Sequence, residues 1–133
     1  MTDPHVPMDR KKIAKDTAVA GNVVTTITVP AGERWLLTNV TVLLTTDATV
    51  ANRVCRVSTT DGTDVIFRNE GSNIAASLTA ARYFTQMVST TKDAINALGL
   101  QILDAGQELL LSIYAGVAGD AYDYVVEYLK VEI

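Results

Sequence analysis

Acidic side chains are the residues of this chain that come closest to a catalytic arrangement. Four of them gather toward the C-terminal end, at Asp104, Glu108, Asp120 and Asp123. Two carboxyl groups that face each other across a sheet could cleave a glycosidic bond, one as an acid and the other as a base or nucleophile. These carboxylates cluster at predicted turns, however, and turns favour Asp because its side chain binds nearby backbone N–H groups. We therefore expect turn-forming residues rather than a catalytic pair.

Metal ligands and activated nucleophiles are scarce. The chain has one histidine, His5, and one cysteine, Cys55, whereas a zinc site takes four ligands that are mainly Cys and His. Cys55 lies in an apolar strand pattern far from His5, so we expect a buried thiol that forms no intramolecular disulfide. Acidic turns at 61–64 and 120–123 have too few oxygen ligands for a calcium loop, and the Ser and Thr hydroxyls lack a base. The sequence predicts no catalytic residue, no cofactor and no metal.

Alternation of apolar and polar residues predicts strands through most of the chain. Val, Ile and Thr dominate these segments, Pro, Gly and Asp separate them, and Asp61-Gly62 is a strong hairpin signal. Eight candidate strands lie at 22–29, 34–45, 53–59, 64–68, 78–88, 100–103, 108–115 and 122–133. Strands do not alternate with helices. We predict an all-β fold, an eight-stranded antiparallel sandwich of the jelly-roll type.

The predicted core follows from which residues share a face of each strand. In the segment 34–45, Leu36, Val40, Val42 and Leu44 share one face that only Thr38 interrupts, and Trp35 lies on the other face as a packing anchor. In the last strand, Tyr122, Tyr124, Val126 and Tyr128 face one way. We expect the core to include Leu36, Val40, Val42, Leu109, Leu111, Ile113, Leu129 and Val131.

Charge is distributed unevenly along the chain. The net charge is −4, but residues 1–15 carry four basic and two acidic side chains, and the rest carries seven and thirteen. Pro4 and Pro7 favour an extended N-terminus, and residues 11–20 could form a short helix or continue the extended segment. We predict an arm over 1–21 and a β-sandwich domain over 22–133. The expected partner-binding residues of the arm are Val6, Met8, Arg10, Lys11, Lys12, Ile13 and Lys15.

The overall composition limits the partners and the location of the protein. An acidic chain is a poor non-specific ligand for DNA, and we expect no direct contact with nucleic acid. No apolar run reaches the roughly 18–20 residues of a membrane span, and the N-terminus lacks the apolar core of a signal peptide. These features predict a protein that remains in the cytoplasm or joins an assembly there.

Several turn-and-strand motifs resemble those of small structural proteins of tailed bacteriophages. They are the segment 29–37 (Val-Pro-Ala-Gly-Glu-Arg-Trp-Leu-Leu), Asn52-Arg53 at a strand start, Asp61-Gly62, Ala105-Gly106 and Gly119-Asp120, within residues 22–133. The resemblance implies a β-sandwich or jelly-roll protein that decorates or cements the capsid shell, or that occupies another place in the virion.

The same resemblance implies a function and partners. The protein would be a non-enzymatic decoration or cement protein, assembled in the host cytoplasm, that binds the major capsid protein on the capsid surface. It would form a homo-oligomer, a dimer or trimer. Two alternatives remain: a tail or head–tail joining component, and a jelly-roll carbohydrate-binding module. In that module, Trp35 and the tyrosines Tyr114, Tyr122, Tyr124 and Tyr128 would stack against sugar rings.

Overall fold

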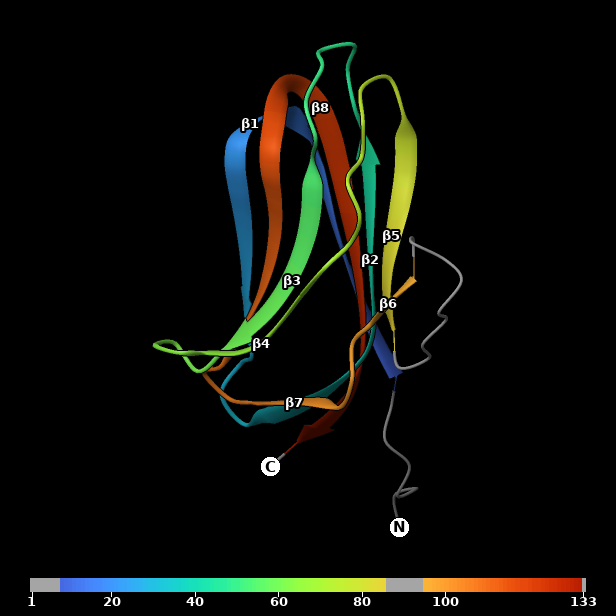
Figure 1. Ribbon diagram of the computed structural model, residues 1–133. Coiled ribbons are helices and arrows are strands. Elements are labelled where there is room, and N and C mark those ends of the chain that lie inside the picture. Colours follow the sequence, from blue (N-terminus) through green and yellow to red (C-terminus); the bar gives the residue numbers. More distant parts are fainter. Residues whose placement is uncertain (1–7, 86–94, 133) are drawn as a thin grey trace.

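The computed structural model describes the backbone of residues 8–85 and 95–132, and the side chains of residues 24–85 and 96–130 (Figure 1). The regular elements in these ranges are all strands. They are β1 (Met8–Thr28), β2 (Glu33–Thr45), β3 (Val54–Thr60), β4 (Val65–Glu70), β5 (Thr79–Thr85), β6 (Ile95–Ala97), β7 (Gln101–Asp104) and β8 (Glu108–Glu132). The predicted all-β class is confirmed.

The strands belong to one sheet that curls into two facing layers and nearly closes. Strand β8 runs through both layers: its first half pairs with β3, and its second half pairs with β2. Strand β1 pairs with β8 along both halves, so the two strands bend over together at one end of the molecule (Figure 1). Beyond β3 lies β4, and beyond β2 lie β5, β6 and β7. All pairs are antiparallel except β5–β6, which is parallel.

The bend of β8 depends on a glycine. Gly119 lies in the segment where the register between β1 and β8 shifts, and its φ is 106°. L side chains rarely adopt this conformation, whereas glycine does so without steric cost. A Cβ atom at this position would also lie 2.5 Å from Asp47 Oδ2. The Gly119-Asp120 pair therefore permits both the change of direction and a close approach to residue 47.

The core lies between the two layers, and a β-bulge in β2 decides which residues reach it. The register of β2 on β8 shifts between Leu37 and Asn39, so Thr38 is an extra residue that reverses the alternation of faces. Trp35 and Leu37 are buried before the bulge, and Val40, Val42 and Leu44 are buried after it. The prediction that Leu36 belongs to the core is wrong, because the bulge leaves it half-buried on the opposite face.

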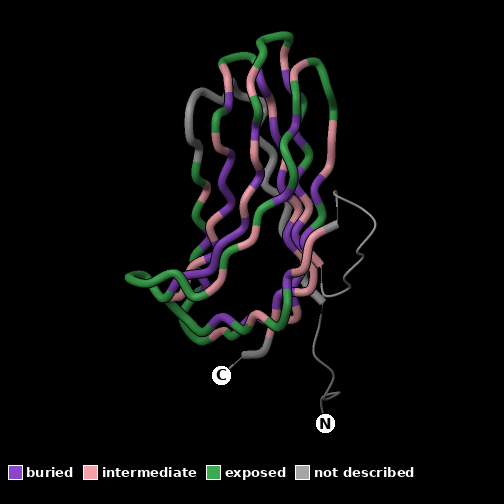
Figure 2. The backbone as a smooth tube through the Cα atoms, viewed as in Figure 1, coloured by how far each residue is buried: buried purple, intermediate pink, exposed green. Residues whose placement is uncertain are grey.

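The remaining core predictions are largely confirmed. Leu109, Leu111 and Ile113 are buried in the first half of β8, and Tyr122, Tyr124, Val126 and Tyr128 are buried in its second half (Figure 2). Leu129 was also expected in the core, but it lies opposite Leu36 in the register and is half-buried. The side chain of Val131 lies outside the described residues.

The predicted boundary between an arm and a domain falls inside β1. Residues from Met8 to Lys15 pair with residues from Leu129 to Tyr122, so the described part of the expected arm is a strand of the sheet and not a separate segment or a helix. The physical reason is the length of β8, which offers backbone hydrogen bonds to β1 in both layers. Backbone pairing does not require apolar side chains, so the basic composition of residues 8–15 gave no sign that they form a strand. Residues 1–7 lie outside the described residues.

Candidate functional site

A buried ion-pair cluster ties the bend of β8 to the connection between β2 and β3. Arg53 is fully buried, and its guanidinium binds both carboxylate oxygens of Asp120: Nε donates to Oδ2 at 3.0 Å and Nη2 to Oδ1 at 3.1 Å. Nη2 also donates to Asp47 Oδ1 at 3.1 Å, and Nη1 donates to the carbonyl of Ala51 at 3.0 Å. The cluster therefore joins three segments that are far apart in sequence.

The carboxylate of Asp120 is fully used by these contacts. Besides Arg53, the backbone N–H groups of Asp47 and Val117 donate to it at 2.9 and 3.0 Å. Burial acts to raise the pKa of Asp120, but the hydrogen bonds from Arg53 and the two N–H groups outweigh burial and hold it below its usual value. A charged carboxylate with every lone pair engaged serves the fold and has no free acceptor for a substrate proton or a cation.

Three further carboxylates considered in the sequence, those of Asp61, Asp104 and Glu108, also have structural partners. Asp104 accepts from Arg34 Nε at 2.6 Å, and Glu108 accepts from the Thr60 hydroxyl at 3.3 Å. Asp61 caps its own turn: the N–H groups of Asp64 and Thr63 donate to it, and these bonds lower its pKa. In the described part of the chain, no group of three or more His, Cys, Asp or Glu side chains is placed to hold a metal ion.

Two buried side chains could in principle react but are held in their neutral forms. Burial raises the pKa of the Cys55 thiol to about 12, although the nearby charge of Arg82 acts in the opposite direction. The pKa of Tyr124 is raised far above its usual value, first by burial and then by Cys55 and Tyr122. A thiol in this state is a poor nucleophile, as expected for the buried cysteine predicted from the sequence.

The aromatic residues considered for a sugar-stacking platform are buried in the core or covered by another side chain. Trp35 is 3% exposed and stacks on Tyr128, with ring centroids 3.9 Å apart. Tyr122 and Tyr124 are buried with their rings edge to face. The guanidinium of Arg56 covers Tyr114 at 4.2 Å from the ring centroid. These side chains therefore do not form the exposed platform of the carbohydrate-binding alternative, because alternation along β8 turns three of the tyrosines inward.

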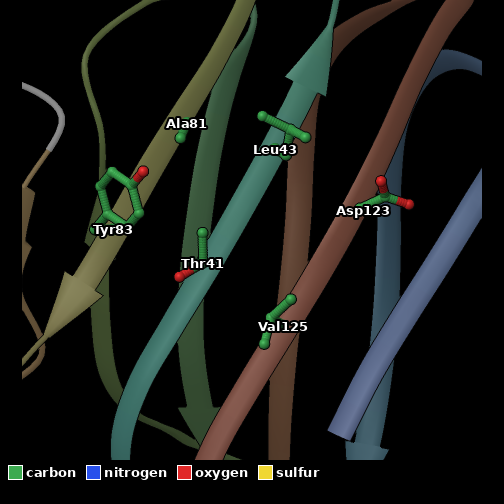
Figure 3. A pocket seen from close by; sticks show the side chains of 6 residues that line it. All are labelled: Thr41, Leu43, Ala81, Tyr83, Asp123 and Val125. Atoms are coloured by element: carbon green, nitrogen blue, oxygen red, sulfur yellow. The ribbon is translucent and has the colours of Figure 1, made fainter.

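A shallow groove lies on the outer surface of the layer formed by β8, β2 and β5 (Figure 3). Its volume is about 260 Å³, and it is lined by Thr41, Leu43, Ala81, Tyr83, Asp123 and Val125. The register explains why these residues meet: Thr41 lies opposite both Tyr83 and Val125, and Leu43 lies opposite both Ala81 and Asp123. Directly opposed residues share a face of the sheet. We call this surface the outer groove.

The outer groove presents apolar side chains to solvent. Leu43 and Tyr83 are 39% and 41% exposed, and Thr41, Ala81, Asp123 and Val125 are half-buried. This surface could not be recognised from the sequence, because the external face of the predicted strand over 78–88 depends on the pairing of β5 with β2. The outer groove is the candidate functional site.

The predicted partner-binding residues of the arm are placed only in part. Met8, Arg10, Lys11, Lys12, Ile13 and Lys15 lie in β1, opposite residues from Leu129 to Tyr122 of β8, and Val6 lies outside the described residues. Their contacts with a partner remain a prediction. No helix in the described ranges is long and apolar enough to cross a membrane.

Comparisons with known proteins give similarity in architecture alone. No family model matches the sequence, and no curated protein matches it. Among solved structures, the VP2 subviral particle of infectious bursal disease virus aligns with 98% of this chain and 33% of its own, with 13% identity and a TM-score of 0.46. Desmodium yellow mottle tymovirus aligns with 100% of this chain and 92% of its own, with 5% identity and a TM-score of 0.42.

A carbohydrate-binding protein is also similar. The structure of TmCBM61 in complex with beta-1,4-galactotriose aligns with 92% of this chain and 69% of its own, with 10% identity and a TM-score of 0.35. The chain spans 19% and 35% of the length of two further matched chains. Because these TM-scores are below 0.5 and virus proteins stand beside a sugar-binding protein, the similarities do not distinguish between functions.

Proposed function

We propose that this protein is a non-enzymatic structural component of a bacteriophage virion that binds the capsid surface, as a decoration or cement protein. The observation that carries the proposal is the outer groove, an exposed apolar surface on the layer formed by β8, β2 and β5. Leu43 and Tyr83 project from β2 and β5 into this surface. Apolar surface of this kind is stabilised when a macromolecular partner covers it.

The arrangement of charged groups supports a structural role. Arg53, Asp47 and Asp120 bind one another inside the molecule, and Arg34 binds Asp104 at its surface. These groups hold segments together and leave no acid–base pair facing a cleft among the described residues. The phage-like motifs at 29–37, 61–62 and 119–120 belong to the same proposal. The proposal includes a jelly-roll arrangement of the strands, which is consistent with the bent β1–β8 pair.

The partner in this proposal is the major capsid protein, and the active form is a dimer or trimer on the virion surface. Strand β1 is the second surface available for assembly: among described residues it pairs with β8 alone, so one of its edges is open. An open edge can pair with another chain. The predicted role of Arg10, Lys11 and Lys12 in contacting a neighbour is retained here as part of the proposal.

Co-sedimentation tests this function. The purified chain is mixed with shells assembled from the major capsid protein encoded in the same phage genome, and with tails of that phage, and each mixture is centrifuged through sucrose. We expect the chain to pellet with shells and not with tails, and light scattering to show at least a dimer. A monomeric chain that pellets with tails alone would support the tail component instead, and retention on a glycan array without binding to either would support the carbohydrate-binding module.

A further inference from the structure

The outer groove contains a carboxylate, that of Asp123, which has no partner among the described residues. Among the residues that the structure describes, none donates a hydrogen bond to Asp123 or forms an ion pair with it. Its directly opposed neighbours in the register are Leu43 of β2 and Ala14 of β1, and neither residue type carries a charge; the basic residue of β1 that lies opposite a residue of the groove lining is Lys12, opposite Val125. Asp123 is half-buried beside apolar side chains and is the one acidic residue in the lining of the outer groove.

Charge complementarity indicates what the outer groove would accept. We propose that it binds an Arg or Lys side chain, and an apolar side chain two positions away from it, from an extended segment of a partner protein. The cationic group would pair with Asp123, its aliphatic stem would cover Leu43 and Val125, and the apolar residue, which lies on the same face of the extended segment, would contact Tyr83 and Ala81. The inference rests on the proposed function, because it names the chemistry of the capsid segment that this face would bind.

The dimensions of the outer groove fit a short extended segment. Neighbouring strands lie about 4.8 Å apart, so the three strands β8, β2 and β5 span about 10 Å. An extended chain advances about 3.3 Å per residue, so three residues of a partner cover this width. Figure 3 shows Asp123 and Tyr83 on opposite sides of the outer groove, with Thr41 and Leu43 between them. A basic residue and an apolar residue two positions away, which share a face of an extended segment, can therefore occupy the two sides together.

A peptide titration tests this inference. The full chain, labelled with ¹⁵N, is titrated with acetyl-Gly-Leu-Ser-Arg-Gly-amide, in which Leu and Arg share one face of an extended chain. A second titration uses citrulline in place of arginine, which keeps the shape and removes the charge. We expect amide shifts confined to residues 41–43, 81–83 and 123–125. Binding should weaken about two- to fivefold with citrulline and with Asp123→Asn, as for the loss of one partly exposed ion pair.

A matched variant separates the local charge from the net charge. Asp64→Asn removes one carboxylate from the exposed turn between β3 and β4, so it changes the net charge by the same amount and should leave the affinity for the peptide unchanged. Equal weakening by Asp64→Asn and Asp123→Asn would overturn the inference. So would equal affinity for the citrulline peptide, shifts elsewhere in the chain, or a change of oligomeric state caused by Asp123→Asn without peptide, since the last result would make the face a self-interface.

Failure of this inference can be distinguished from failure of the proposed function. If the peptide does not bind but the chain pellets with shells, shell binding uses another surface and only the assignment of the groove is wrong. If the peptide binds as expected but the chain does not pellet with shells, the outer groove accepts a basic segment from a different partner and the proposed capsid role is wrong. A galactotriose titration that produces the same shifts at residues 81–83 would overturn the peptide assignment in favour of a sugar.

Discussion

The buried cluster around Arg53 yields the most direct test of the fold. Replacing Arg53 with Met keeps an unbranched side chain of similar length but removes the guanidinium. Asp120 would then stay buried with only two backbone N–H donors, and the carbonyl of Ala51 would lose its hydrogen bond. Removing one partner of a buried ion pair typically costs about 3–5 kcal/mol. Because the two N–H donors still compensate Asp120, we expect Arg53→Met to cost about 3 kcal/mol, the lower end of that range.

The same reasoning predicts non-additivity and a dependence on pH. The double variant Arg53→Met, Asp120→Asn should cost about 2 kcal/mol less than the sum of the two single variants. Each single variant leaves one charged group buried without its partner, whereas the double variant removes both charges. The pKa of Asp120 in the folded protein is lower than in the unfolded chain, where it is about 3.9. The stabilisation is therefore present above that pH and is lost as the pH falls through the folded value. Arg53→Met should reduce this loss.

Urea unfolding followed by Trp35 fluorescence measures these free energies. Trp35 is buried against Tyr128, so its emission should shift on unfolding. The matched control is Arg34→Met, which breaks the ion pair with Asp104 where both side chains are about half exposed; it should cost no more than about 1 kcal/mol. A cost below about 1 kcal/mol for Arg53→Met, or strict additivity in the double variant, would refute the reasoning.

Three further predictions follow from the core and the turns. Gly119→Ala should destabilise the fold by about 1–3 kcal/mol because of its positive φ. It should cost more than Gly62→Ala, since a Cβ atom at Gly62, whose φ is 97°, meets open space, whereas a Cβ atom at Gly119 meets Asp47. Equal costs of the two variants in urea unfolding would contradict the close approach of Gly119 to Asp47. Trp35→Ala should cost about 3–5 kcal/mol in urea unfolding followed by far-UV circular dichroism, since the variant has no tryptophan to report by fluorescence. A cost below about 1 kcal/mol would mean that the ring contributes little packing. Above pH of about 8.5, where an unfolded thiol ionises, wild-type stability should fall with pH because the pKa of Cys55 is raised to about 12. Cys55→Val should remove about 1.4 kcal/mol per pH unit of that fall, as thermal melts at stepped pH would show.

Turns and inward faces could be predicted from the sequence because they depend on local chemistry. The Asp61-Gly62 turn carries its own signal, since Asp61 binds the N–H groups that follow it and Gly62 supplies the positive φ. The alternation of Tyr122, Tyr124 and Tyr128 marked one face of β8, and that face is buried. Both features are determined by residues within a few positions of one another.

Features that depend on distant partners could not be predicted. The bulge at Thr38 is set by the pairing of β2 with β8, and its hydroxyl donates to the carbonyl of Glu127 at 3.0 Å. The extension of β1 to Met8 depends on the length of β8, and the burial of Arg53 depends on Asp120 being brought to it by the bend. The outer groove exists only because β5, β2 and β8 lie side by side. Sequence patterns within one segment carry no information about such registers.

The position of β8 in the pairing scheme has a consequence for biosynthesis. Strands β1, β2 and β3 all pair with β8, yet each is made before it. While the chain is being synthesised, β3 can pair with β4 and β2 with β5, but β1 has no strand to bind among the described elements until β8 leaves the ribosome. Contacts between segments so far apart in sequence form slowly. The emerging chain should therefore carry an unpaired β1 through most of translation and complete both layers in one late step.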